Sequence, residues 1–126
     1  MNLNQVSVPA YDLNAAIAFY RLLGLRLIVM TDHYARFELP QGDATISIVK
    51  ADDPIGTGTG VHLYFECHDL DGEVARLKSA GVVFDTGPVD QTWLWREAWL
   101  KDPYGNSLCL YHAGRNRKHP PWRILD

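Results

Sequence analysis

The sequence lacks the features of a secreted, membrane-spanning or nucleic-acid-binding protein. It has only two cysteines in 126 residues, Cys67 and Cys109, and their spacing indicates free thiols rather than a disulfide framework. No apolar run approaches the roughly 18 residues that cross a bilayer, and the first residues show no signal-peptide pattern. A net charge of −3 gives no general attraction to polyanions. We therefore expect a cytoplasmic protein without a membrane or nucleic-acid partner.

Two halves of the sequence have similar patterns. In each half an alternating, strand-like segment is followed by an Asp-Leu pair, an amphipathic segment and a glycine. The pairs are Asp12-Leu13 and Asp69-Leu70, and the glycines are Gly24 and Gly81. Aspartate is a common helix N-cap, and glycine ends helices by adopting a left-handed conformation. The pattern therefore predicts a duplicated strand–helix unit.

The remaining segments predict a duplicated α+β domain. Hydrophobic residues make up 47% of the chain, enough for one globular core at this length. We expect helices after Asp12 and over residues 71–79, and strands over residues 5–8, 25–30, 34–39, 44–50, 61–67, 82–84, 93–100 and 107–111. This order gives two βαβββ modules, at about 1–50 and 61–112, within one domain of residues 1–112. Residues 51–60 are expected to be a linker, and residues 113–126 an extended tail.

A family resemblance rests on several of these motifs together. They are Asp12-Leu13, Phe19-Tyr20, Leu23-Gly24-Leu25, the segment of residues 62–70 and the turn Asp102-Pro-Tyr-Gly-Asn106. In this combination the chain resembles the vicinal oxygen chelate superfamily, which includes glyoxalase I, extradiol dioxygenases and bleomycin-resistance proteins. The resemblance implies two modules that form a curved, mixed-sheet cup, and a homodimer. It also implies a small-molecule ligand and metal ligands on the first and last strands of each module.

The metal ligands that the resemblance implies are incomplete. The first-strand positions fall on Gln5 and His62, and the last-strand positions fall near Ser47 and on Cys109 instead of on glutamates. The implied set for a divalent ion such as Zn, Ni, Fe or Mn is therefore Gln5, His62 and Cys109. Only a deprotonated Cys109 would bring negative charge, and a buried cysteine more often behaves as a small apolar side chain. No organic cofactor is expected.

Strand alternation adds further candidates in the second half. His62, Tyr64 and Glu66 share one face of a strand, so Glu66 could act as a proton-transfer group. Trp93, Trp95, Glu97 and Trp99 also alternate. They predict either an aromatic wall for a ligand, with Glu97 as its polar or catalytic contact, or core packing beneath a helix or the tail.

Three functions remain open. The first is a small-molecule protein of glyoxalase or bleomycin-resistance type with metal-assisted lyase or isomerase chemistry on a carbonyl or enediolate. The second is a metal-free protein that binds and sequesters a small molecule against the aromatic wall. Extradiol dioxygenase chemistry comes third, because no two-histidine, one-carboxylate set occupies the matching positions.

Overall fold

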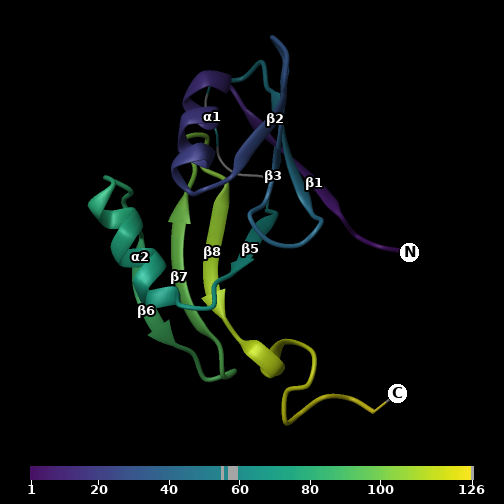
Figure 1. Ribbon diagram of the computed structural model, residues 1–126, viewed down its shortest axis with the longest axis vertical. Helices are drawn as coiled ribbons and strands as arrows, with labels where there is room; N and C mark the ends of the chain where they lie inside the picture. The colour runs from purple at the N-terminus through teal and green to yellow at the C-terminus, as the bar shows by residue number, and fades with distance from the viewer. Residues whose placement is uncertain (55, 57–59, 126) are drawn as a thin grey trace. The chain divides into compact units, whose positions relative to one another are not determined.

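The computed structural model describes residues 1–54, 56 and 60–125, and it confirms the predicted α+β duplication (Figure 1). The elements of the first repeat are β1 (Gln5–Ala10), α1 (Leu13–Leu22), β2 (Arg26–Met30), β3 (Tyr34–Glu38) and β4 (Thr45–Lys50). Those of the second are β5 (His62–Glu66), α2 (Leu70–Ser79), β6 (Thr86–Asp90), β7 (Arg96–Lys101) and β8 (Ser107–His112). Each repeat is a βαβββ module with its own four-stranded sheet.

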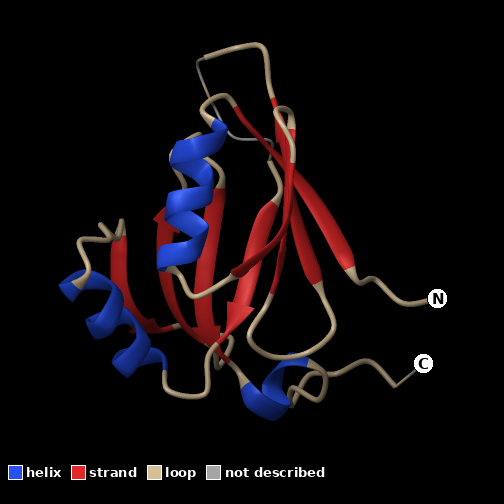
Figure 2. Ribbon diagram, turned by 45° about the horizontal axis from the view of Figure 1, so that its top comes forward, coloured by secondary structure: helices blue, strands red, loops and turns tan. Residues whose placement is uncertain are grey.

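Three predicted segments differ from the structure. Residues 82–84 are not a strand, and the strand of that region, β6, begins at Thr86. The strand predicted over residues 93–100 begins only at Arg96, because Leu94 adopts a left-handed φ of 68° and residues 91–95 form a turn. The segment predicted to be extended from residue 113 begins with a 3₁₀ helix, Gly114–Arg117, directly after β8 (Figure 2).

The chain divides into two compact units. The first comprises residues 1–61 together with 101–106, and the second comprises residues 62–100 and 107–126. The turn between β7 and β8 is thus part of the first unit, although its flanking strands belong to the second. Among the described residues, no helix is long and apolar enough to cross a membrane.

In the first unit, α1 covers one face of a sheet with strand order β1-β4-β3-β2. The Asp12 carboxylate caps the helix by accepting a hydrogen bond from the Ala15 amide, and Gly24 ends it with a φ of 103°, as the sequence predicts. β1 and β4 pair in parallel, and β4 and β3 pair in antiparallel orientation. The buried face of the sheet carries aliphatic and aromatic residues that pack against the helix: Val8, Ala10, Ala35, Phe37, Ile46 and Ile48.

A buried carboxylate holds the Lys101–Asn106 turn in the first unit. Asp102 is 5% exposed and accepts hydrogen bonds from the Tyr20 hydroxyl at 2.7 Å and from the Asn106 side-chain amide at 2.7 Å. Its other oxygen accepts the backbone N–H groups of Tyr104 and Asn106. The Asn106 amide also donates to the carbonyl of Pro9 on β1. Burial and the neighbouring Asp102 charge raise the pKa of Tyr20, so its hydroxyl stays a donor.

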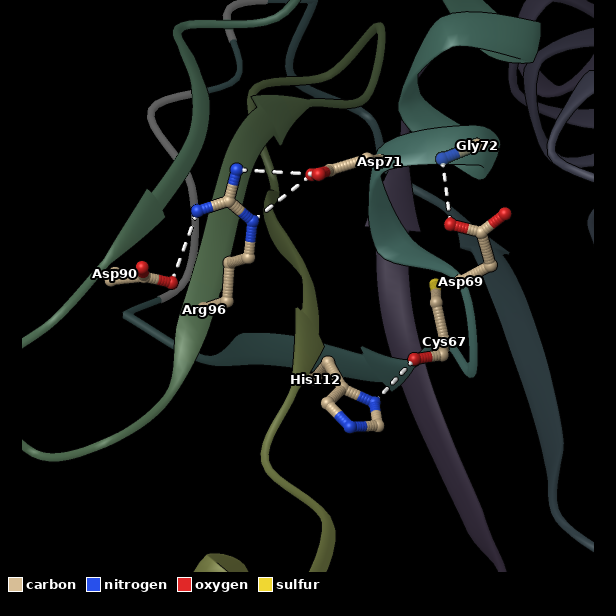
Figure 3. A network of polar contacts seen from close by, with 7 residues as sticks. All are labelled: Cys67, Asp69, Asp71, Gly72, Asp90, Arg96 and His112. Atoms are coloured by element: carbon tan, nitrogen blue, oxygen red, sulfur yellow. Dashed lines mark hydrogen bonds and ion pairs between the residues drawn. The ribbon is translucent and has the colours of Figure 1, made fainter.

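In the second unit, α2 covers one face of a sheet with strand order β5-β8-β7-β6. Arg96 on β7 joins the helix to the sheet, because its guanidinium pairs with Asp71 of α2 and with Asp90 of β6, both at 3.0 Å (Figure 3). Next to this pair, the Asp69 carboxylate caps α2 at Gly72. Because Arg96 points to the helix-covered face, alternation along β7 places Glu97 and Trp99 on the opposite face.

We predict that Asp102→Ala destabilises the protein strongly. The substitution leaves two side-chain donors and two backbone N–H groups without their buried acceptor, so we expect the free energy of unfolding to fall by about 3 kcal/mol or more. Urea denaturation would measure it. Tyr20→Phe removes one of the four bonds and should cost about 1–2 kcal/mol. An exposed aspartate, Asp43, supplies the control: Asp43→Ala should change stability by less than about 0.5 kcal/mol. Equal effects of Asp102→Ala and Asp43→Ala would contradict the anchoring role.

Candidate functional site

The face of the second sheet opposite α2 is aromatic. Strand register places Tyr64 beside Cys109 and Glu66 beside Tyr111, and this face also carries Trp99. The opposite, helix-covered face holds buried aliphatic residues such as Leu63, Leu100 and Leu108. The two faces of one sheet therefore differ in chemistry, as alternation requires when only one of them meets a helix.

Four rings form the centre of this surface, which we call the aromatic face: Tyr64, Trp95, Trp99 and Tyr111. Trp95 and Tyr111 stack with their centroids 4.6 Å apart. The Tyr64 ring meets each of the other three edge-on, at centroid distances of 5.6–6.0 Å. His62 lies beside Trp99 at 5.2 Å. Tyr64 is 48% exposed, so a ligand can reach its ring. Such pairs hold rings in fixed orientations and leave apolar surface available for stacking.

Glu97 fixes the orientation of two indoles. Its carboxylate is buried, with 4% exposure, and accepts the indole N–H of Trp93 at 2.7 Å on one oxygen and that of Trp99 at 3.0 Å on the other. Within the described part of the chain, no lysine or arginine forms an ion pair with it. Glu97 thus joins Trp93 and Trp99, whereas Trp95 contacts Tyr64 and Tyr111, and both Trp93 and Trp95 precede the strand. Glu97 therefore places a carboxylate at the N–H edges of two indoles.

Burial raises the pKa of three titratable groups on the aromatic face. Burial is the main cause that raises the pKa of Tyr64, and the next are the nearby Cys109 and Glu97. The pKa of Tyr111 is raised by burial and then by Glu66. Burial, with a further contribution from Glu97, raises the pKa of Cys109 to about 12. All three groups therefore stay protonated at neutral pH.

Glu66, the second predicted proton-transfer residue, binds the segment that follows β8. One of its oxygens accepts the backbone N–H groups of Ala113 and Gly114, both at 2.8 Å, and the other lies 3.9 Å from the Arg117 guanidinium. These contacts hold the start of the 3₁₀ helix, which is tied further by the Trp95 indole donating to the Asn116 carbonyl. The Glu66 carboxylate therefore stabilises the position of the 3₁₀ helix that follows β8.

The face of the first sheet opposite α1 is polar. Its centre, which we call the polar face, consists of Gln5, Tyr34, Arg36, Thr45 and Ser47. The Tyr34 hydroxyl hydrogen-bonds the buried Ser47 hydroxyl at 2.6 Å and accepts from Arg36 Nε at 2.9 Å. Gln5 Oε1 accepts from the Thr45 hydroxyl at 2.8 Å. Hydrogen bonds from Ser47 and then Arg36 lower the pKa of Tyr34, with a smaller effect of Gln5.

Comparison with known proteins identifies the family. The sequence model of the Glyoxalase/Bleomycin resistance protein/Dioxygenase superfamily matches residues 2–110. The chain belongs to this superfamily. Among curated proteins, no sequence matches it significantly. The family match agrees with the resemblance and with the two βαβββ modules of the structure.

Solved structures of the superfamily share the fold at low sequence identity. A glyoxalase/bleomycin resistance protein/dioxygenase from Nocardioides has a TM-score of 0.79 at 21% identity, with 98% of this chain and 89% of that one covered. Lactoylglutathione lyase from Agrobacterium tumefaciens has a TM-score of 0.73 at 21% identity, covering 88% and 92%. A bleomycin-binding protein in complex with bleomycin has a TM-score of 0.71 at 21% identity, covering 89% and 98%. These similarities establish the fold.

The residues that the superfamily resemblance assigns to a metal are poor ligands here. In the first unit, Gln5 is neutral and already accepts a hydrogen bond, while the nearby Arg36 is a permanent cation that repels a dication. In the second unit, the Cys109 thiol is fully buried and stays protonated, so it brings no negative charge. His62 remains as a single strong donor. Among the described residues, no group of three or more His, Cys, Asp or Glu side chains could hold a metal ion. The donor set does not fit a divalent ion.

The sequence analysis assigned no role to three residues of these faces. Tyr34 and Arg36 alternate in a segment correctly predicted as a strand, but their polar face was not interpreted. Tyr111 follows Cys109 by two positions, and the same alternation places it on the aromatic face. The period-two pattern was therefore the available signal for all three.

We predict that Cys109 makes the protein less stable at alkaline pH. The unfolded thiol loses its proton near its ordinary pKa of 9.0, whereas the folded thiol keeps its proton up to a pKa of about 12. Because the pKa is raised in the folded state, this stabilising contribution is complete below pH 9 and is lost as the pH rises from 9 towards 12. Urea denaturation at several pH values would show a steeper alkaline loss in the parent than in Cys109→Ala. The difference between the two proteins isolates this thiol from the tyrosines and lysines that also titrate. Identical pH slopes would show that the Cys109 thiolate is tolerated in the folded protein and would reopen its role as a ligand.

Proposed function

We propose that this protein binds a planar aromatic cation on the aromatic face of its second unit and does so without a metal ion. The observation that carries the proposal is the joint presence of an exposed, edge-supported ring, Tyr64, and a buried carboxylate, Glu97, that binds the N–H edges of two indoles. Ring faces attract cations, and the attraction grows when the site is partly removed from water.

The chemistry of the aromatic face favours binding over proton transfer. Both Glu97 oxygens accept indole N–H groups, and the Glu66 carboxylate holds the 3₁₀ helix, so neither acid is presented as a free proton donor. The bleomycin-binding protein with the same fold offers a precedent for small-molecule binding in this superfamily. Metal-assisted lyase chemistry requires a bound metal ion as the electrophile, and the described side chains that could hold one are poor ligands. Sequestration of a small molecule is therefore the function that we propose, in a cytoplasmic protein that we expect to be a homodimer.

Binding would use the residues in distinct roles. Tyr64, Trp95 and Trp99 supply ring surface, and Tyr111 supports Trp95 by stacking. Glu97 positions the indoles and adds a negative potential. His62, at the edge of the rings, is placed to contact a bound molecule through its exposed imidazole. These roles require shape and charge matching, and no covalent step.

We predict that the positive charge of the ligand contributes to its affinity. Calorimetric titration with 1-methylquinolinium, a permanent cation, and with quinoline, its uncharged counterpart at neutral pH, should show tighter binding of the cation. Glu97→Gln keeps the side-chain size and removes the charge, but its amide has only one acceptor oxygen, so one of the two indole N–H bonds is lost as well. It should weaken 1-methylquinolinium binding by about fivefold to tenfold and quinoline binding by less. Bleomycin serves as a larger probe in the same titrations.

A pair of exposed tyrosines provides the matched control. Tyr64 is 48% exposed on the aromatic face, whereas Tyr11 is 44% exposed in the first unit. Tyr64→Ala should weaken 1-methylquinolinium binding by roughly tenfold, and Tyr11→Ala should leave it unchanged. Equal affinities for cation and neutral molecule in the parent, or equal effects of the two tyrosine variants, would contradict the proposal.

A further inference from the structure

The polar face of the first unit carries a second cluster of functional groups. Register brings three strands together there: Ser47 of β4 pairs with Ser7 of β1 on one side and with Arg36 of β3 on the other. Because paired residues of neighbouring strands point to the same face, their side chains form one polar row across the sheet. This row faces away from α1, whose side of the sheet is filled by the aliphatic core.

Arg36 is the cation of this row, and its hydrogen bond within the row uses only the Nε–H group of the guanidinium. Arg36 donates through Nε to the Tyr34 hydroxyl, and its guanidinium carbon lies 5.4 Å from the centre of the Tyr34 ring. A guanidinium carries five N–H donors. No carboxylate of the described residues forms an ion pair with Arg36, since the strand neighbour Glu38 pairs instead with Arg26. The two terminal nitrogens of a half-buried cation are thus left for an external acceptor.

The surrounding hydroxyls fix the orientation of that cation. The Tyr34 oxygen accepts from Arg36 and hydrogen-bonds the Ser47 hydroxyl, which is fully buried. The Arg36 side chain is therefore held at Nε and stacked near a ring, so little conformational entropy is lost when its terminal nitrogens bind a ligand. A preorganised, planar, two-nitrogen fork matches the two oxygens of a carboxylate.

We propose that the polar face binds the carboxylate group of a small organic molecule, with the Arg36 terminal nitrogens as a bidentate donor and the Tyr34 and Ser47 hydroxyls as orienting groups. The site requires no metal, because the guanidinium supplies the positive charge. The aromatic face belongs to the other unit, and the ligand proposed for it carries the opposite charge.

Site-resolved NMR titration tests this site with acetate as the probe. In the parent protein, the Arg36 Nε–H signal and the Ser47 amide signal should shift saturably with acetate in the millimolar range, as expected for one charge-assisted fork. Sodium chloride at matched ionic strength should give no saturable shift. Methylphosphonate tests a tetrahedral oxyanion at the same signals.

Variants separate charge from geometry. Arg36→Gln should abolish saturable acetate binding, and Arg36→Lys, which keeps the charge but loses the fork, should weaken it by roughly fivefold or more. Tyr34→Phe should weaken it a few-fold. Arg26→Gln removes another arginine of the same sheet and should have no effect. Far-ultraviolet circular dichroism checks the folding of each variant, and Arg36→Lys decides the case if Arg36→Gln does not fold.

Four results would overturn the proposal. They are no saturable shift with acetate, an equal response to chloride, equal acetate affinity in the parent and Arg36→Lys, and saturation by methylphosphonate without acetate binding. The last result would assign the surface to a tetrahedral anion instead. None of these outcomes bears on 1-methylquinolinium binding at the aromatic face, so the two proposals fail separately.

Discussion

The chemistry of this protein depends on the alternation of side chains along strands that a helix covers on one side only. In each unit the helix-covered face is filled by aliphatic residues, and the same strands place every second residue on the other face. The same strands therefore supply the core with one set of residues and the candidate site with the residues between them. A shift of one position would exchange the two faces, so the register that stabilises the fold also specifies the two proposed binding surfaces.

Each of these two surfaces carries one charged side chain that is held by hydrogen bonds. The first unit places the Arg36 guanidinium among neutral hydroxyl and amide groups, and in the second the Glu97 carboxylate accepts two indole N–H groups. Each buried or half-buried charge is held by hydrogen bonds from its own face, which offsets the cost of removing it from water. The chain thus has the superfamily fold, whereas the positions that the resemblance assigns to metal ligands differ in charge from a glutamate-containing set. Here a permanent cation lies near Gln5 and a protonated thiol occupies position 109.

The sequence predicted most elements because their signals are local. The caps Asp12 and Asp69 and the left-handed Gly24 and Gly81 define both helices. β6 was missed because it is an edge strand that contains Gly87 and Pro88, residues that weaken a strand signal. The start of β7 was misplaced because the left-handed Leu94 interrupts an alternating sequence. The hydrogen bonds of Arg36 and Glu97 depend on register and on a turn, so composition and spacing could not reveal them.

Metal analysis of the purified protein tests the central claim most directly. Protein prepared without chelator and then titrated with Zn²⁺, Ni²⁺, Fe²⁺ and Mn²⁺ should hold no stoichiometric ion after dialysis, because the described faces lack a charged ligand set. One tightly bound equivalent per chain that disappears in His62→Ala would contradict the account. It would show that the imidazole at position 62 anchors a metal centre after all.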